Sequence, residues 1–387
     1  MNMNKRISIA LFIFLFPFVG VCQLTVQLVI HAVPEGTLPG NEIYVAGSFN
    51  NWDPADKGFR FTKQGDTYVL DMKLAAGNYA YKITQGSWDK VECNAAGDDI
   101  GNRQFLATSD TVIRIDIASW KTAGKKNIKK STASSHVQIL NTAFFLPQLN
   151  RKRRIWIYLP AGYTGTAQRY PVLYMQDGQN VFEDSSSYAG EWGVDEALDS
   201  LGPASKACIV IAIDHGGARR MNEYCPYDFS GNPTAGSTDK AKGEGDEYVD
   251  FLVKTLKPYV DGHFRTLKDK KNTFIAGSSM GGLIAFYAVL KYPKVFGGAG
   301  VFSPSFWVAP SIYDDIEKRG YKINSRLYFY MGGEEGYSML PDMEKACREL
   351  QEVSPAYIKK VIRQDGQHNE ASWRRDFPEF YQWILQD

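Results

Sequence analysis

The stretch Lys271-Asn-Thr-Phe-Ile-Ala-Gly-Ser-Ser-Met-Gly-Gly-Leu-Ile-Ala-Phe-Tyr287 decides the fold of the longer, C-terminal part of the chain. Residues 273–276 are β-branched, aromatic or small and predict a short strand, whereas the apolar residues after Gly281 predict a helix. Ser279 lies in the turn between them, where glycines at 277 and 281 relieve the crowding of a sharp strand-to-helix turn. The pattern predicts a serine nucleophile. The amide of Met280 would then face developing negative charge at the helix start. A plain glycine-rich turn is the alternative.

Length and charge limit the class of protein. A chain of 387 residues can bury a large core and suggests two domains. Hydrophobic residues make up 44% and charged residues 22%, as in ordinary globular proteins. The formal net charge of +1 gives no electrostatic case for binding nucleic acid or anionic membranes.

The N-terminal 22 residues are typical of an export signal. Lys5 and Arg6 precede an apolar segment, residues 7–21, and cleavage before Gln23 would release the mature chain. The apolar segment is short for a bilayer span. We therefore predict a signal peptide over residues 1–22, no integral membrane span after cleavage, and an exported protein that is periplasmic or secreted. A lipid anchor on Cys22 is the alternative.

The four cysteines beyond the signal contain no C-x-x-C pair, which argues against a zinc knuckle or a thioredoxin-like site. Cys208 begins an apolar run and is predicted to be a small core residue. An oxidising compartment would permit a disulfide, but the sequence does not specify a pairing. The four are Cys93, Cys208, Cys225 and Cys347.

Two domains and a linker are expected. Residues 23–120 carry short alternating strands separated by turn residues, which predict a β-sandwich. Residues 121–137 are basic, small and polar without an apolar period, and predict a flexible linker. In residues 138–387 apolar strands alternate with amphipathic helical segments, which predicts a doubly wound, mostly parallel sheet. The strands are expected at 155–159, 172–175, 209–213, 273–276, 327–331 and 358–362, and the helices at 247–263, 280–292 and 339–352.

The base that would activate Ser279 is found by elimination. Sheets of the α/β-hydrolase type place the nucleophile first along the chain, then an acid, then a histidine. Of five histidines only His368 follows Ser279, in a loop between a predicted strand and the last helix. His368 is therefore the candidate base, with an isolated solvated histidine as the alternative.

The acid that would orient His368 should follow an intervening strand. The strand at 327–331 ends in Gly332-Gly-Glu-Glu335, and we choose Glu335 because Glu334 would point the opposite way. Asp342 and Asp365 remain open as alternatives. A second oxyanion donor is expected after the strand at 172–175. There Gly178 allows close backbone approach, and the amide of Gln179 would act beside that of Met280.

The C-terminal domain resembles the esterase family that includes feruloyl esterases of carbohydrate esterase family one and enterochelin esterases. The matching motifs include Tyr170-Pro-Val-Leu-Tyr, Arg220-Met-Asn-Glu-Tyr-Cys-Pro226 and Gly277-Ser-Ser-Met-Gly-Gly282. The resemblance implies an α/β-hydrolase fold, and its Gly-x-x-Asp/Glu pattern starting at Gly332 favours Glu335. Many relatives carry His-Gly where this chain has Asp177-Gly178, so contacts to the acyl group are expected to differ.

The N-terminal domain resembles starch- and glycogen-binding modules, which implies an immunoglobulin-like all-β sandwich. The resemblance rests on Ile43-Tyr-Val-Ala-Gly-Ser-Phe-Asn-Asn-Trp-Asp-Pro54, Tyr81-Lys-Ile-Thr-Gln-Gly-Ser-Trp88 and Gly101-Asn-Arg103. It implies that two tryptophans stack on sugar rings while a lysine and an asparagine bind hydroxyls. A purely structural module is the alternative. The implied residues are Trp52, Lys82, Trp88 and Asn102.

Together these features predict an exported serine ester hydrolase that needs no metal or cofactor. Its substrate would be an ester on a polysaccharide, such as a feruloyl or acetyl group, or a small ester. Two alternatives stay open: hydrolysis of a siderophore ester, for which Arg219 and Arg220 could supply positive charge, and a glycan-binding protein with an idle hydrolase domain. The sequence carries no signal for an oligomeric state.

Overall fold

The computed structural model describes residues 23–35, 37, 40, 42–50, 52–95, 97, 100–121, 131–187, 190–202, 206–230, 240–335 and 339–386. The predicted signal peptide, including Cys22, and most of the predicted linker lie outside these described residues. Among the described residues, none of the helices combines the length and the apolar character that a membrane span requires.

The N-terminal module is built from strands joined by turns. One sheet has the order β3-β4-β1-β8, a second has the order β2-β5-β7, and β6 pairs with β9. Side chains from both larger sheets, Leu28 and Ile83 among them, meet in one hydrophobic cluster. The alternating apolar pattern thus gives the predicted all-β module. Its strands are β1 (Leu24–Ala32), β2 (Tyr44–Gly47), β3 (Thr62–Gln64), β4 (Thr67–Leu74), β5 (Gly77–Thr84), β6 (Glu92–Cys93), β7 (Arg103–Ala107), β8 (Thr111–Asp116) and β9 (Ser119–Trp120).

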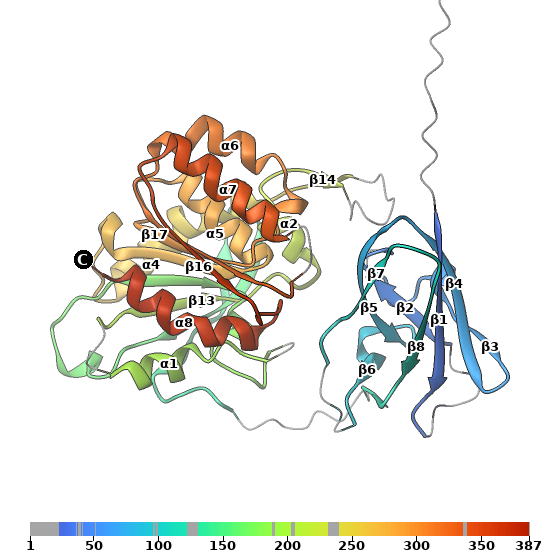
Figure 1. Ribbon diagram of the computed structural model, residues 1–387. Coiled ribbons are helices and arrows are strands. Elements are labelled where there is room, and N and C mark those ends of the chain that lie inside the picture. Colours follow the sequence, from blue (N-terminus) through green and yellow to red (C-terminus); the bar gives the residue numbers. More distant parts are fainter. Residues whose placement is uncertain are drawn as a thin grey trace, which may run out of the picture.

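The C-terminal domain contains an eight-stranded, mostly parallel sheet (Figure 1). Its order is β10-β11-β13-β12-β16-β17-β18-β19, and β11 is the one strand of these eight that runs in the opposite direction to the rest. The predicted mostly parallel sheet is therefore confirmed. Its strands are β10 (Val137–Leu146), β11 (Arg151–Tyr158), β12 (Val172–Gln176), β13 (Ile209–Ile213), β16 (Thr273–Ser278), β17 (Gly298–Phe302), β18 (Arg326–Gly332) and β19 (Tyr357–Arg363).

Both faces of this sheet are buried. In β13, Ile211 belongs to one core cluster and its neighbour Ala212 to another, because successive side chains point to opposite faces. Helices α1 and α8 contribute to the second cluster, and α2 to α7 contribute to the first. These observations do not test whether the sheet is doubly wound or whether the N-terminal module is immunoglobulin-like, so both assignments stay predictions. The helices are α1 (Val194–Leu201), α2 (Arg220–Tyr224), α3 (Gly245–Phe251), α4 (Lys257–His263), α5 (Met280–Lys291), α6 (Ile312–Arg319), α7 (Met339–Val353) and α8 (Glu370–Ile384).

The helix predicted over 247–263 is interrupted by a wider turn. The structure has α3, then a π-helical turn over Leu252–Leu256, then α4. Pro258 lies in the first turn of α4 and has no amide hydrogen, so the regular hydrogen-bond ladder cannot pass through it. The segment therefore stays helical while its spacing changes.

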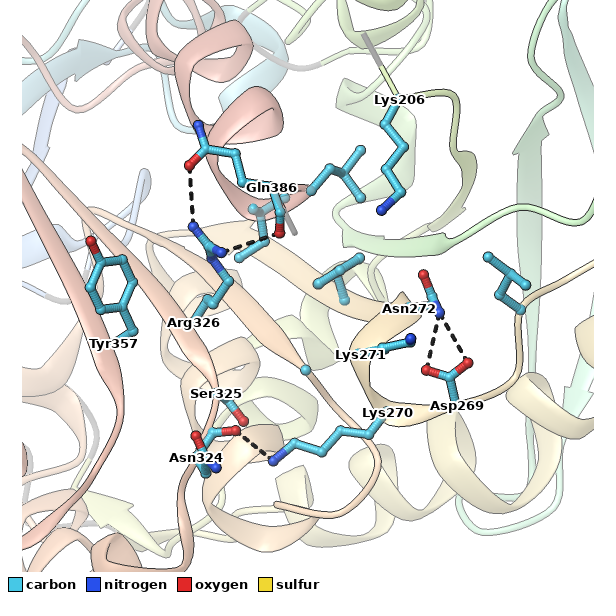
Figure 2. Close-up of a pocket in the computed structure, with 15 residues that line it drawn as sticks. Lys206, Asp269, Lys270, Lys271, Asn272, Asn324, Ser325, Arg326, Tyr357 and Gln386 are labelled. Atoms are coloured by element: carbon cyan, nitrogen blue, oxygen red, sulfur yellow. Dashed lines mark hydrogen bonds between the residues drawn. The ribbon is translucent and has the colours of Figure 1, made fainter.

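The two edges of the parallel sheet differ in character. At the carboxyl ends, β12 leads into Asp177, β16 into Ser279 and β17 into Ser303. At the amino ends lies a cavity of about 650 Å³, which Figure 2 shows from close by. Ligand sites in open parallel sheets gather beyond the carboxyl ends, so the first edge is where a catalytic site is expected.

Candidate active site

The turn at Ser279 has the backbone that a nucleophile elbow requires. Ser279 has φ 59° and ψ −121°, a conformation rarely adopted by residues with a side chain. A Cβ atom on Gly277 would lie 2.7 Å from the backbone carbonyl carbon and oxygen of Gly281. Glycine is therefore required at 277 so that the first turn of α5 can pack directly against the end of β16.

The neighbouring strand holds Ser279 in place. Its amide donates to the carbonyl oxygen of Phe302 at 2.9 Å, and its carbonyl oxygen accepts from the amide of Ser305 at 3.1 Å. The hydroxyl oxygen of Ser279 lies 3.1 Å from that of Ser305. Between the described residues Ser279 and His368 there is no hydrogen bond. The hydroxyl of Ser279 is hydrogen-bonded to that of Ser305 instead.

The structure brings His368 and Glu335 together. His368 Nδ1 lies 2.9 Å from Glu335 Oε2, while Glu335 Oε1 accepts from the hydroxyl of Ser303 at 2.6 Å and from the amide of Gly332 at 2.7 Å. The Glu335 side chain is 1% exposed and that of His368 is 34% exposed. One carboxylate oxygen is thus anchored to the protein and the other fixes the imidazole, whose Nε2 is left for proton transfer.

The other carboxylates considered from the sequence have different partners. Glu334 accepts from the side chain of Gln367. Asp342 contacts the hydroxyl of Tyr313, and Asp365 forms an ion pair with Arg375. None of these three described residues forms a hydrogen bond or ion pair with His368. Of the four candidates, the structure places Glu335 alone beside the imidazole.

Two residues that support this group were missed by the sequence analysis. Ser303, with φ 44°, donates to Glu335 and accepts from Trp373 Nε1 at 2.9 Å. The Trp373 ring packs edge-on against His368, with ring centroids 5.2 Å apart. A signal was available, because Ser303-Pro-Ser305 follows directly after the short apolar stretch that forms β17.

The loop after β12 is held by an ion pair. Asp177 has φ 55° and ψ 50°, and its carboxylate accepts two hydrogen bonds from Arg220, at 2.7 and 2.8 Å. A Cβ atom on Gly178 would lie 2.8 Å from the backbone of β13, which explains the glycine. The charge of Arg220 is therefore balanced by Asp177, although the sequence had offered it as a contact for anionic substrates.

Gln179 is fixed from two directions beside the elbow. Its side-chain oxygen accepts from the amide of His215 at 3.1 Å, and its carbonyl oxygen accepts from the hydroxyl of Ser186 at 2.8 Å. Because β12 and β16 are parallel neighbours, Gln179 and Met280 follow adjacent strands at the same edge. The two backbone amides predicted to bind an oxyanion, those of Gln179 and Met280, therefore follow the ends of two adjacent strands.

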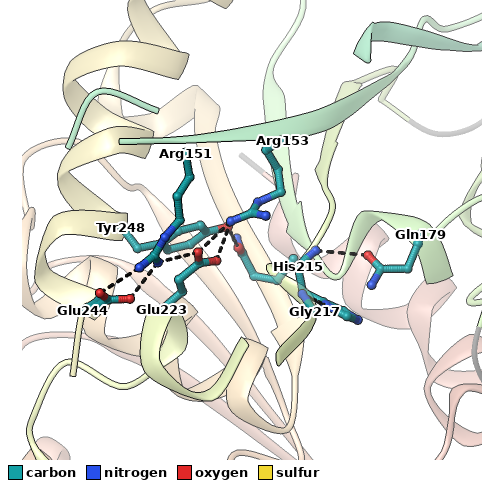
Figure 3. A network of polar contacts seen from close by, with 9 residues as sticks. Arg151, Arg153, Gln179, His215, Gly217, Glu223, Glu244 and Tyr248 are labelled. Carbon is teal, nitrogen blue, oxygen red and sulfur yellow. Dashed lines mark hydrogen bonds and ion pairs between the residues drawn. The ribbon is translucent and has the colours of Figure 1, made fainter. Parts of the chain in front are cut away.

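Figure 3 shows how buried charges fix the helix that carries Arg220. Glu223 in α2 is fully buried and accepts from Arg151 and Arg153, both at 2.7 Å, and Arg151 also contacts Glu244. A buried carboxylate needs such partners, so α2 is tied to β11 and its first residue, Arg220, reaches Asp177.

His215, in the same close-up, is kept neutral. Burial lowers the pKa of its imidazole, and its Nδ1 accepts from the amide of Gly217 at 2.9 Å. The proton of the neutral ring therefore lies on Nε2.

Glu370, two residues beyond His368, is also buried. Burial raises the pKa of its carboxyl group, which accepts a hydrogen bond from the side chain of Asn180.

In the N-terminal module, the four residues implied by the resemblance line one cavity of about 300 Å³. The rings of Trp52 and Trp88 lie 6.3 Å apart at 37°, so they form two walls rather than one flat platform. Lys82 Nζ donates to the carbonyl oxygen of Ile100 at 2.5 Å. Asn102 completes the lining.

Family models match both domains. The model described as putative esterase matches residues 147–384, more than half of the chain. The model described as Pullulanase X25 domain matches residues 35–114, within the N-terminal module.

Individual relatives agree with these matches. The chain is 29% identical over 245 residues to an endo-1,4-β-xylanase/feruloyl esterase of Xylanibacter ruminicola, covering 62% of this chain and 30% of that protein. It is 32% identical over 258 residues to the iron(III) enterobactin esterase of Dickeya dadantii, covering 62% and 53%. The crystal structure of the enterobactin esterase FES from Shigella flexneri shares the fold, with a TM-score of 0.53, 14% identity and coverage of 89% and 88%. The chain thus spans less than two thirds of the length of the two sequence relatives.

Proposed function

Because the chain belongs to the putative esterase family and is a carboxylic ester hydrolase, we propose that Ser279, His368 and Glu335 are its catalytic residues. The observation that carries this proposal is the contact between His368 Nδ1 and the buried carboxylate of Glu335, at the sheet edge where Ser279 occupies the strained elbow. The remaining nitrogen of His368 is then free to serve Ser279.

The proposed reaction has two halves. Ser279 Oγ attacks the ester carbonyl carbon while its proton passes to His368 Nε2, and the carbonyl oxygen becomes an oxyanion bound by the amides of Met280 and Gln179. The intermediate collapses, His368 protonates the departing alkoxide, and an acyl-serine remains. Water then attacks the acyl group with His368 again as base, which releases the carboxylic acid and restores Ser279. Before the first step, the Ser279 hydroxyl turns from Ser305 towards His368.

Covalent labelling tests the nucleophile. We expect a fluorophosphonate probe to label the full chain at Ser279, identified by peptide mass spectrometry, and to leave Ser279→Ala unlabelled. Ser278→Ala is the matched control, because Ser278 is a buried strand residue and its loss should preserve labelling. A wild-type chain that stays unlabelled would favour the alternative class, a glycan-binding protein with an idle hydrolase domain.

The substrate we propose is an ester on a polysaccharide, of the feruloyl or acetyl type. Two observations support it: the Pullulanase X25 match over residues 35–114, and the relative named as both xylanase and feruloyl esterase. A polysaccharide-binding module attached to an esterase would hold the polymer near the site and raise the local ester concentration.

The glycan site we propose is the cavity between Trp52 and Trp88. Flat apolar rings suit the C–H faces of sugars, and Lys82 and Asn102 offer polar groups beside them. Affinity gel electrophoresis in amylose or xylan should retard the wild-type chain and retard Trp88→Ala much less. Leu106→Ala is the matched control, since Leu106 is 50% exposed on β7 and does not line the cavity. Equal retardation of all three proteins would reject this site.

Hydrolysis of a siderophore ester is the second candidate, favoured by the enterobactin esterase relative. Its anionic substrate would need unpaired positive charge, and Arg220 is balanced by Asp177. Arg219 forms no ion pair within 4 Å among the described residues, although its charge helps to lower the pKa of the nearby Glu244. Comparing kcat/KM for methyl ferulate, an aryl acetate and a cyclic catecholate triester separates the two: preference for the triester by tenfold or more, roughly 1.4 kcal/mol, would favour the siderophore reading.

We also propose that the protein is exported. The basic and apolar N-terminal residues support this, as does the match to a domain of polysaccharide-degrading enzymes. Mass spectrometry of the protein expressed in a bacterium with a protein export pathway tests the proposed export. A chain starting at Gln23 indicates cleavage of the signal peptide, whereas added lipid mass on Cys22 indicates an anchor.

A further inference from the structure

Glu370 carries a buried carboxyl group that the proposed reaction does not use. It is the first residue of α8, lies two positions after His368 and is 9% exposed. Burial raises the pKa of its carboxyl group, the negative charge of Asp177 adds to this rise, and His368 opposes it. Both of these charged groups at the carboxyl edge of the sheet therefore act on Glu370. Taking a carboxyl group out of water is costly unless it makes a specific contact, so its partner matters.

The partner of Glu370 is Asn180, in the loop after β12. Asn180 Nδ2 donates to Glu370 Oε1 at 3.0 Å, and Asn180 is also 9% exposed. Because both partners are shielded from water, little solvent competes for this hydrogen bond, and a loss of either partner would leave a buried polar group unpaired. The bond thus ties the loop after β12 to the start of the helix that follows His368.

Asn180 directly follows Gln179, whose amide is a proposed oxyanion donor. The amide of Asn180 donates to the carbonyl oxygen of Asp177 at 2.8 Å, which closes the short helical turn Gly178–Asn180. Its carbonyl oxygen accepts from the amide of Trp192 at 2.7 Å. Asn180 is therefore held through its backbone on two sides and through its side chain by Glu370. A displacement of Asn180 would tilt the turn that contains Gln179.

A second contact between this loop and α8 lies further along the chain from Gln179. The ring of Trp192 stacks on that of Trp373, with ring centroids 5.7 Å apart. This contact packs the helix against the later part of the loop, but aromatic stacking tolerates small sliding motions. The hydrogen bond from Asn180 to Glu370 is directional and acts at the residue next to Gln179. It is therefore the contact that can fix the orientation of the turn.

We propose that Glu370 is a positioning residue for ester hydrolysis, which acts through Asn180 to hold the Gln179 amide where the oxyanion forms. The inference rests on the proposed function, in which Ser279 is the nucleophile and Gln179 an oxyanion donor. Such a donor contributes only when it points at the developing charge, and removing one typically lowers kcat about 10²- to 10³-fold. Because Glu370 orients the donor and does not supply it, its loss should have a smaller effect.

Replacing the carboxyl group by an apolar side chain of similar length tests the positioning role. In Glu370→Met, Asn180 keeps its donor but loses its acceptor. We expect kcat for an aryl acetate to fall at least roughly fivefold while KM stays within about twofold, because oxyanion donors act mainly in the transition state. The inhibition constant of an arylboronic acid, which forms a tetrahedral adduct on a serine, should rise by the same factor. A smaller fall in kcat, or an unchanged inhibition constant, would overturn the proposal.

The conservative variant Glu370→Gln separates the hydrogen bond from the charge. Its side-chain oxygen can accept from Asn180 as Oε1 does, so we expect it to recover most of the kcat that Glu370→Met loses. If Glu370→Gln loses as much as Glu370→Met, the bond to Asn180 is not the cause and the proposal fails. Glu352→Met is the matched control, since it makes the same substitution at an exposed position in the last turn of α7 and should keep wild-type kinetics.

A double-mutant cycle tests whether Glu370 acts through Asn180. Asn180→Ala should lower kcat by itself, and Asn180→Ala/Glu370→Met should lower it little further, because the bond is already lost. Additive losses would show that Glu370 acts on another residue and would overturn the proposal. If Glu370→Met does not fold, Glu370→Asp, whose shorter side chain draws the carboxyl group back from Asn180, takes its place in the cycle.

Fluorophosphonate labelling of the wild-type chain separates this inference from the proposed function. A wild-type chain that is not labelled at Ser279 would remove the proposed nucleophile, and the positioning role of Glu370 would fall with it. A labelled wild-type chain together with an unchanged kcat in Glu370→Met would overturn the positioning role alone.

Discussion

Replacing the Glu335 carboxylate by an amide is the sharpest test of the proposed catalytic group. In Glu335→Gln the side-chain oxygen can still accept from Ser303 and the amide of Gly332, as Oε1 does in the wild type. The new amide nitrogen then faces His368 Nδ1, where Oε2 was. Since two donors cannot bond each other, the imidazole must present Nδ1 as an acceptor and carry its proton on Nε2. That nitrogen can then no longer accept the proton of Ser279.

The expected effect on the rate is large. The buried carboxylate lies 2.9 Å from the imidazole, where it stabilises the imidazolium that forms when Ser279 gives up its proton. In serine hydrolases generally, an amide at this position lowers kcat about 10⁴-fold, equivalent to about 5 kcal/mol. We therefore expect kcat for an aryl acetate near pH 7.5 to fall by roughly 10³ to 10⁴, with a nearly unchanged KM. The thermal midpoint should change little, because the anchoring hydrogen bonds are kept.

Glu334→Gln is the matched control for this experiment. Glu334 is the adjacent residue, has the same side chain and is exposed, and among the described residues its carboxylate is hydrogen-bonded only to Gln367. Its kcat should stay within about twofold of wild type, as surface changes usually do. A Glu335→Gln enzyme within tenfold of wild type, or a Glu334→Gln enzyme that loses as much, would refute the assignment of the acid.

Three further results are expected. Burial raises the pKa of Asp195 from 3.8 to about 7, so the folded state binds its proton more tightly than the unfolded state; the free energy of unfolding should fall by up to roughly 4 kcal/mol between pH 4 and 7. In urea unfolding Asp195→Asn should lack this component, and an equal fall would contradict it. Gly277→Ala places a methyl group 2.7 Å from the backbone of Gly281, so we expect a loss of about 3 kcal/mol and of ester hydrolysis, and a wild-type thermal midpoint would contradict this. Cys208, Cys225 and Cys347 are free and buried, so a reducing agent should leave the thermal midpoint within about 1 °C, whereas a fall of several degrees would reveal a disulfide.

The parts of the fold with strong local patterns were predictable from sequence. The six predicted strands of the C-terminal domain all appear, with bounds shifted by a few residues, because continuous apolar runs are typical of buried parallel strands. Cys208 is a core residue, as predicted. The positions of Ser279 and His368 followed from chain order, and the contact of Glu335 with His368 needed only the assumption that loops after neighbouring strands meet.

Contacts made across long sequence distances were not predictable. The end of the predicted flexible linker, residues 131–136, is bound to the C-terminal domain: Thr132 donates to Glu191, and the amide of Ser134 donates to Asp195. Small polar residues without an apolar period look the same whether they are solvated or bonded to distant carboxylates. The conformation of such a segment depends on contacts with residues far away in the chain, which the local sequence does not predict.

Strand β17, over Gly298–Phe302, was missed for a reason that also explains the site. Glycine has a low strand propensity, so Gly-Ala-Gly-Val-Phe gives a weak local signal. Yet a Cβ atom on Gly298 would lie 2.5 Å from Ile384, and one on Gly300 would lie 2.7 Å from Phe380, so these glycines let α8 pack closely on the sheet.

The close packing of α8 is what brings the histidine's support into place. Trp373, in the first turns of α8, donates to the hydroxyl of Ser303 just beyond β17, and that hydroxyl donates to Glu335. A bulkier β17 would push α8 outwards and separate Trp373 from Ser303, which would leave the Ser303 hydroxyl without its donor and His368 without its packed ring. The residues that weaken the strand signal are therefore the ones that allow the helix, the acid and the imidazole to meet. This is why the proposed nucleophile could be predicted from a local motif and its supporting residues could not.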